Sequence, residues 1–281
     1  MIKWYGNGGG WGGDAPVYDV DFDDLSDDSY PAVWITVQVH EPTPTRTGRD
    51  CISLYTGAGD LDGRKALSYG ARYYDEGMAC PYEGDWHEKR IMCFQAAELL
   101  YLHAARKGNP ISHLNLGYVY SYNRCEGKYW GWWESPYIRD DVQSGRRVLI
   151  PYPHEERALE HFRVAAEAGL AEACYKYGDL LRDGRGCEPD PVAAFGQFQR
   201  AYDLGRGERP TIWGSAALRL GHAYEEGEGC FQSFEEARIW YLRAVSGLDI
   251  AVRSGDEWYR RSLRRAEDGL ARVEQELDGS Y

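Results

Sequence analysis

The sequence predicts a mostly helical protein: an α-solenoid of about four helix pairs, a C-terminal capping helix and a small N-terminal segment that contains β structure. Three observations support this prediction. Glycines recur at one phase of successive helical segments, alanines seven residues apart follow each of them, and the clearest strand pattern lies in the first 60 residues. Hydrophobic residues make up 43% of the 281 residues, so the chain can bury a core.

Residues 1–60 form an acidic segment rich in glycine and aspartate, and we expect a domain boundary at its end. The segment holds ten carboxylates and three basic side chains, which gives it a charge of −7 out of −13 for the whole chain. Within it, residues 33–39 are β-branched and aromatic and are bounded by prolines, so they predict a strand. The strand is expected to pair with residues 2–5 or with residues 17–22.

Two motifs in this segment resemble ligand-binding loops, but neither meets the requirements of the loop that it resembles. Residues 8–13 match Gly-x-Gly-x-x-Gly, but no helical pattern follows them to place a helix N-terminus at a dinucleotide. The aspartates that begin at Asp19 resemble a calcium loop, yet Asp24 stands where the loop needs glycine and Tyr30 where it needs glutamate. We interpret residues 14–30 as a solvated acidic segment.

The rest of the chain repeats a pattern of two helices. Glycine in the middle of the first helix allows a second helix to approach closely, and the alanine pair marks the facing surface of that second helix. A glycine then ends each second helix, as expected for a left-handed C-cap. Large rings beside the alanines are expected to fill the space between neighbouring pairs. The first-helix glycines are Gly70, Gly117, Gly178 and Gly221; the terminal glycines are Gly108, Gly169, Gly205 and Gly247; the rings are Tyr101, Phe162, Phe198 and Tyr241.

At these residues the chain resembles a Sel1-like repeat protein, a relative of the tetratricopeptide repeats. Residues 220–229 match the family pattern Leu-Gly-x-x-Tyr-x-x-Gly-x-Gly, and residues 240–244 match its second-helix pattern. The resemblance implies a solenoid over residues 61–281 that binds a peptide or protein on a concave face. Its expected units are residues 64–108, 112–169, 171–205 and 212–247, with a capping helix at 255–277 that carries Trp258 on its apolar side.

The first two units carry insertions, because their glycines lie 47 and 61 residues from the next one, compared with 43 in the third unit. The second insertion, residues 125–155, is rich in aromatic side chains. Two interpretations stay open: the rings cover the edge of the stack, or they form a partner-binding patch. The residues of that patch would be Tyr129, Trp130, Trp132, Trp133 and Tyr137.

Composition argues against several classes of protein. A pI near 5.0 disfavours general binding to nucleic acid. The sequence has no apolar run of about 18 residues, so no transmembrane helix is predicted. The N-terminus lacks an apolar signal core, and an odd count of seven cysteines predicts reduced thiols, so we expect a cytoplasmic protein. Cys80, His87 and Cys93 lack the close spacing of a structural zinc site. We therefore expect no metal and no cofactor.

No catalytic motif was found, and no catalytic residue is predicted. The favoured function is a scaffold or adaptor for an unidentified protein or peptide, with no prediction of oligomeric state. The alternative is an enzyme or ligand-binding protein with a site between the N-terminal segment and the first repeats; a third possibility is an acidic mimic that uses residues 14–30. By analogy with helical repeats, the concave face would present Tyr74, Tyr118, Tyr122, Tyr175, Asp179, Arg182, His222 and Glu225.

Overall fold

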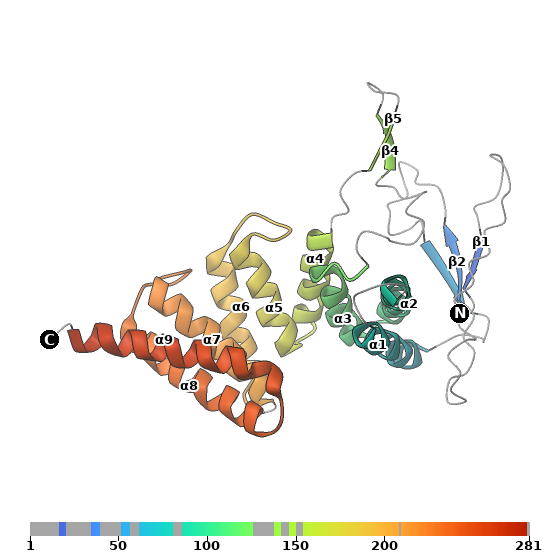
Figure 1. Ribbon diagram of the computed structural model, residues 1–281. Helices are drawn as coiled ribbons and strands as arrows, with labels where there is room; N and C mark the ends of the chain where they lie inside the picture. The colour runs from blue at the N-terminus through green and yellow to red at the C-terminus, as the bar shows by residue number, and fades with distance from the viewer. Residues whose placement is uncertain are drawn as a thin grey trace. The chain divides into compact units, whose positions relative to one another are not determined.

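The computed structural model describes residues 62–80, 86–125, 154–207 and 209–279, together with the backbone of five short strands. Figure 1 shows these elements along the chain. They fall into two compact units. The first unit comprises residues 1–112 and 122–152, and the second comprises residues 113–121 and 153–281.

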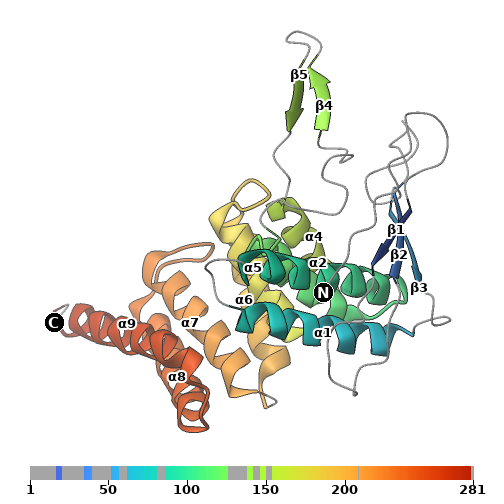
Figure 2. The same ribbon diagram turned by 45° about the vertical axis from the view of Figure 1, so that its right-hand side comes forward.

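The helical part of the first unit is an antiparallel pair, α1 (Gly63–Ala79) and α2 (Trp86–Arg106). The two helices lie side by side in Figures 1 and 2. Helix α1 begins at Asp62, whose carboxylate accepts hydrogen bonds of 2.9 Å from the backbone N–H groups of Arg64 and Lys65. Those N–H groups belong to the first helical turn, where backbone N–H groups have no hydrogen-bond acceptor within the helix.

The strands belong to the same unit. β1 (Val17–Val20), β2 (Ile35–Val39) and β3 (Ile52–Thr56) form an antiparallel sheet in that order, with Ile35 opposite Val20 and Thr56. Strand β2 thus pairs with one of the two segments suggested by the sequence, and β3 was not anticipated. β4 (Ile138–Asp141) and β5 (Arg146–Leu149) form an antiparallel hairpin inside the second insertion.

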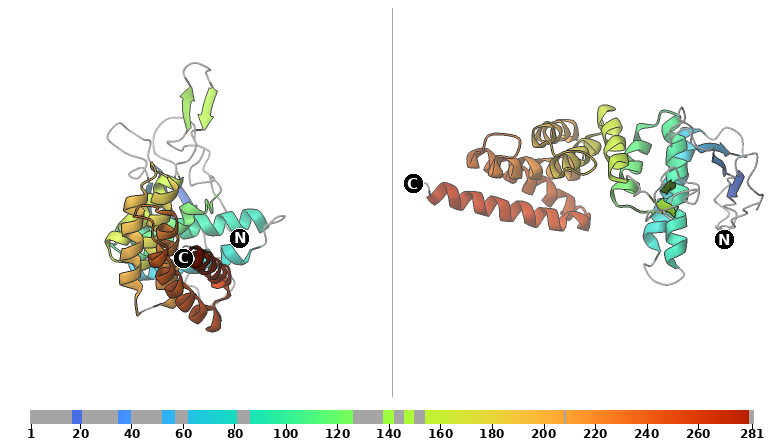
Figure 3. Two further views of the ribbon diagram at one scale, coloured as in Figure 1. Left: turned by 90° about the vertical axis from the view of Figure 1, so that its left-hand side faces the viewer. Right: turned by 90° about the horizontal axis from the view of Figure 1, so that it is seen from above.

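The second unit is a helical stack. Helix α3 (Pro110–Ser121) enters it at His113 and is followed by α4 (His154–Glu167), α5 (Ala171–Asp183), α6 (Pro191–Gly205), α7 (Pro210–Glu226), α8 (Phe234–Arg253), the short helix η1 (Glu257–Tyr259) and α9 (Arg260–Gly279). From α4 to α8 each helix packs on the next, and α9 packs along α8 and α7 (Figure 3). The predicted α-solenoid is confirmed.

Aromatic rings occupy the glycine positions within each pair. A Cβ atom on Gly178 would lie 2.6 Å from the ring of Phe198, and one on Gly70 would lie 2.6 Å from the ring of Tyr101. Phe162 and Tyr241 meet Gly117 and Gly221 in the same way. The rings therefore fill the crossing of their own helix pair, a role that was not predicted. The paired alanines of the second helices are buried as predicted: Ala97, Ala104, Ala158, Ala165, Ala194, Ala201, Ala237 and Ala244.

The terminal glycines divide into two groups. Gly108 and Gly169 have φ angles of +80° and +87°, which confirms the predicted left-handed ends. Gly205 is instead the last residue of α6, packed against Ile212, and Gly207 takes the positive φ. Gly247 lies inside α8, where a Cβ would lie 2.6 Å from the ring of Trp213. There the glycine permits a close helix approach, so the helix continues past it.

The loops between α5 and α6 and between α7 and α8 rest on the preceding second helix. A Cβ on Gly186 would lie 2.6 Å from the backbone of Glu155, where α4 begins. Gly229 approaches the backbone of Pro191, where α6 begins, in the equivalent way. Both glycines have positive φ, so each loop needs glycine for its conformation and for this contact.

Helix α9 closes the stack, as predicted for the capping helix. Its buried residues are Ala266, Gly269 and Val273, and Gly269 lies against the ring of Tyr241. Trp258 is an exception to the prediction, because it lies in η1 before the helix begins and is 85% exposed.

Candidate protein-interaction face

Polar side chains connect the first helices of neighbouring pairs in the second unit. The Tyr118 hydroxyl of α3 donates a 2.5 Å hydrogen bond to Glu172 of α5. Arg219 of α7 donates to both carboxylate oxygens of Asp179 of α5, with an Nε–Oδ1 distance of 2.6 Å. We call these four residues and Lys176, which lies between them on α5, the first-helix face.

Lys176 is the cation at the centre of this face. Its Nζ lies 5.1 Å from the ring centre of Tyr118 and 5.5 Å from that of Tyr175. Burial lowers the pKa of Lys176, and the Arg219 guanidinium lowers it further, while Asp179 and Glu172 oppose the shift. Lys176 forms no ion pair with any residue that the structure describes. Its charge is thus stabilised by two aromatic rings and by the Asp179 and Glu172 carboxylates.

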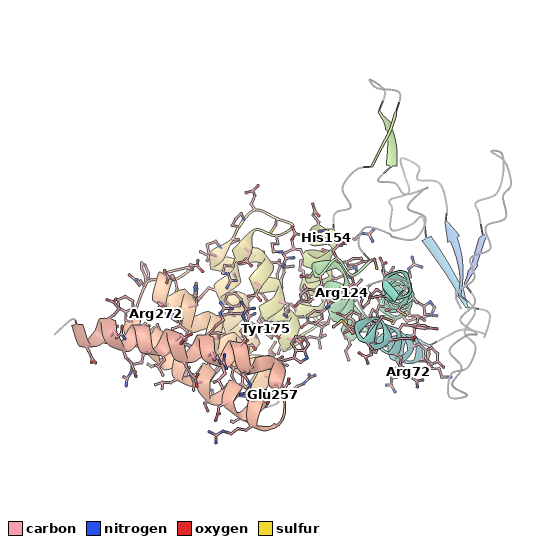
Figure 4. All side chains as sticks on the ribbon, in the orientation of Figure 1. Arg72, Arg124, His154, Tyr175, Glu257 and Arg272 are labelled. Atoms are coloured by element: carbon pink, nitrogen blue, oxygen red, sulfur yellow. The ribbon has the colours of Figure 1, made fainter. Side chains whose placement is uncertain are left out.

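Arg219 and Tyr175 form the more buried part of the same region. The Arg219 guanidinium lies 4.6 Å above the ring centre of Tyr175. Burial opposes the charge of Arg219, but the Asp179 carboxylate outweighs it and raises the arginine pKa above its ordinary value. Tyr175, labelled in Figure 4, is 3% exposed, and burial raises its pKa well above 10.0. Its buried ring therefore packs against the Arg219 guanidinium on the side away from solvent. Arg182 contacts Asp179 at 3.8 Å and lies at the edge of this region.

Two of the predicted site residues lie in the other unit. Tyr74 of α1 accepts a 3.3 Å hydrogen bond from Arg124, and the Arg124 guanidinium lies 4.8 Å from the ring centre of Tyr122. Burial raises the pKa of the Tyr74 hydroxyl. The two tyrosines are thus brought together around one arginine.

His222 and Glu225 follow on α7 and differ in accessibility. His222 Nδ1 lies 3.6 Å from Glu228, and the histidine is partly exposed. Glu225 is 8% exposed, and its carboxylate accepts hydrogen bonds from Tyr241 of α8 and from Arg272 of α9. Figure 4 labels Arg272 on α9. The Glu225 oxygens are used inside the chain, and its predicted contact with a partner stays untested.

The predicted aromatic patch of the second insertion lies outside the described residues: Tyr129, Trp130, Trp132, Trp133 and Tyr137. Lys176 and Arg219 were missed by the sequence analysis, although a signal was present. Each lies two residues before the glycine of its first helix, whereas Tyr118 and Asp179 lie one residue after theirs. Positions three apart share a helix face, so the glycine register identifies both sets.

Comparison with known proteins identifies the repeats. The family model described as Sel1 repeat matches residues 154–170, 171–205 and 214–247, which correspond to α4, to α5 and α6, and to most of α7 and α8. These three stretches are Sel1 repeats. The resemblance to Sel1-like repeat proteins that the sequence indicated is therefore confirmed. Sel1 repeats generally form scaffolds for protein–protein interaction, and their fold is typically non-catalytic.

Two solved structures are similar to the chain. One is a Sel1 repeat protein from Oxalobacter formigenes, at 18% identity and a TM-score of 0.45, covering 74% of this chain and 73% of the other. The second is a protective antigen of uropathogenic Escherichia coli with an SLR fold, at 17% identity and a TM-score of 0.34. That match covers 75% of this chain and 45% of the other.

The described residues offer neither a metal site nor a membrane-spanning helix. No group of three or more His, Cys, Asp or Glu side chains in the described part of the chain could hold a metal ion. Among the helices that the structure describes, none has the length and apolarity that crossing a membrane requires. The six cysteines in the described ranges form no disulfide with one another.

Proposed function

We propose that the chain is a protein-interaction scaffold that binds a peptide segment on the first-helix face of its second unit. The observation that carries the proposal is Lys176, a largely buried ammonium group between two tyrosine rings that forms no ion pair with a described residue. Removing a cation from water is costly unless an anion or aromatic ring compensates. A carboxylate of a bound segment would supply the stronger of these partners.

The neighbouring groups support the rest of the proposed binding mode. Tyr118, which is partly exposed, offers ring surface to an apolar side chain beside that carboxylate. Asp179 and Arg219 hold each other in a fixed geometry, which keeps the face ordered before binding. The segment that fits these groups carries an acidic residue next to an apolar or aromatic one.

The proposal is tested by selecting peptides from a random display library with the full-length chain. We expect enriched peptides to share an acidic and an apolar residue, and their affinity for the Lys176→Glu variant to fall by about tenfold or more. The matched control is Arg200→Glu, the same change of charge at an exposed position of α6. A library that yields no binder, or binders that respond equally to the two variants, would contradict the proposal.

A further inference from the structure

Helix α8 carries an apolar row on its solvent side. Ile239, Leu242 and Ile250 are 42%, 46% and 46% exposed, and Ser246 is exposed between them. These residues follow one another at intervals of three and four, so they form one stripe along the helix. We call these four residues the α8 stripe.

The equivalent rows of the other second helices in this unit carry no large apolar side chain. Equivalent positions are found by counting from the first buried alanine of each helix. In α4 they hold Glu160, Arg163 and Glu167, and Arg163 donates hydrogen bonds to Glu160 at 2.9 Å and to Glu167 at 2.5 Å. The row in α6 consists of Gly196, Gln199 and Asp203. The repeat therefore does not require apolar residues at these solvent-facing positions. The apolar residues of the α8 stripe need an explanation other than packing within the repeat.

The stripe is bounded on both sides by contacts within the chain. On one flank, Arg238 lies 3.6 Å from Glu274 of α9. On the other flank, the guanidinium of Arg243 lies 4.4 Å from the ring centre of Trp240 and 5.6 Å from that of Tyr202 in α6. The apolar residues lie on the remaining open face of α8, between these two flanks.

The pattern of the stripe is complementary to itself when reversed. Glu235 and Arg253 lie on the same face at opposite ends of α8, both exposed. If a second α8 packs antiparallel about a two-fold axis at position 244, Glu235 faces Arg253 of the second copy and Leu242 faces Ser246. The same axis brings Ile239 beside Ile250 of the second copy. Opposite charges meet at both ends, and a large side chain meets a small one at the centre.

We propose that two copies of this chain associate through antiparallel packing of their α8 stripes. A two-fold axis requires a surface that is complementary to itself, and the α8 stripe meets this requirement in both charge and size. A contact made by one helix from each copy is smaller than the roughly 800 Å² per partner of a standard interface. We therefore expect a reversible dimer that dissociates on dilution.

Sedimentation equilibrium of the full-length chain over about two decades of concentration tests the proposal. The expected result is a mass that rises from one copy to two. Leu242→Glu, which puts a charge at the centre of the contact, is expected to raise the dissociation constant by about tenfold or more. The control is Val192→Glu, a similar change at an exposed residue of α6 outside the stripe, which leaves the constant unchanged.

Charge reversal tests the register. Glu235→Arg alone and Arg253→Glu alone place like charges opposite each other in both halves of the dimer, so each weakens it, whereas the double variant restores it. Circular dichroism melting verifies that each variant folds. A chain that stays monomeric at every concentration, a dimer indifferent to Leu242→Glu, or a double variant as weak as the singles would overturn the proposal.

Discussion

Glu225 connects three helices of the second unit through one carboxylate. It accepts hydrogen bonds from Tyr241 of α8 and, at 2.8 and 2.9 Å, from Arg272 of α9. Burial by itself raises the pKa of the carboxyl, but the hydrogen bonds from Arg272 and Tyr241 outweigh it and lower the pKa below the ordinary value of 4.5. A buried polar group is stabilising when its hydrogen bonds are complete, so Glu225 stabilises the packing of α9 against α7 and α8.

The lowered pKa of Glu225 predicts a particular dependence of stability on pH. The charged carboxylate contributes stability at pH values above 4.5, and this contribution is lost as the pH falls through the lower pKa of the folded state. Glu225→Gln should therefore destabilise the protein at pH 7, by about 1–3 kcal/mol, with a difference that shrinks under acid conditions. Urea unfolding midpoints of both proteins at a series of pH values provide the measurement.

The control for this experiment is Glu226→Gln, which removes a charge from the exposed neighbouring residue. We expect it to change stability little at any pH, because its side chain is open to solvent. A Glu225→Gln variant whose deficit is the same at pH 7 and at pH 3 would show that the charge of the carboxylate is not what stabilises the site.

Helix pairs of this protein depend on glycines whose missing side chains make room for a ring. Gly178 and Phe198 illustrate the fit, because the ring occupies the place that a Cβ would take. Not every helical glycine has this role: Gly196 of α6 has no atom within 4 Å of its Cβ position. The two glycines therefore predict opposite responses to the same substitution.

Gly178→Ala should destabilise the protein by about 1–3 kcal/mol, because the added methyl group overpacks the crossing of α5 and α6. Gly196→Ala should instead stabilise it by about 0.5–1 kcal/mol, because alanine restricts the unfolded chain and favours the helix. Thermal or urea unfolding of the two variants measures both signs. A shift in the same direction for both variants would contradict this account of the crossing.

An element could be predicted from the sequence where residues close to it in the chain determine it, and could not where a residue on another helix determines it. Gly117 and Gly221 indicated their helices because a mid-helix glycine is costly and recurs only where packing needs it. The interior place of Gly247 was not predictable, since the reason for it is Trp213 on a different helix. Likewise, Asp179 was predicted from the sequence but its partner Arg219 was not, because the pairing depends on which first helices become neighbours.

At the scale of the whole molecule, the described parts form two compact units, and the second is a stack with a dedicated end. Each pair buries its apolar surface against its neighbours, so the last pair needs a cover. Helix α9 supplies it with Val273 and Ala266, which are fully buried, and with Gly269 against Tyr241. The stability of the second unit is therefore expected to depend on its final helix.

A chain truncated after Gly255 should lose stability on the order of 5 kcal/mol, because several apolar side chains lose their cover and each is worth about 1.5–3 kcal/mol. Glu225 would also lose Arg272, which leaves a charge without its main partner. Urea unfolding monitored by circular dichroism, with binding of a hydrophobic dye as a second readout, measures the effect. Arg272→Ala in the full-length chain separates the lost ion pair from the lost cover, and an unchanged midpoint on truncation would refute the capping role.

The loops that rest on the preceding helix through Gly186 and Gly229 have a practical consequence for protein engineering. Because these contacts are made by backbone atoms, the side chains that follow them are not constrained by packing. Glu188 and Phe231 occupy equivalent positions two residues after these glycines, and both are exposed although their chemistry differs completely. These two positions are therefore suitable places to attach a fluorophore or to insert an epitope without disturbing the array.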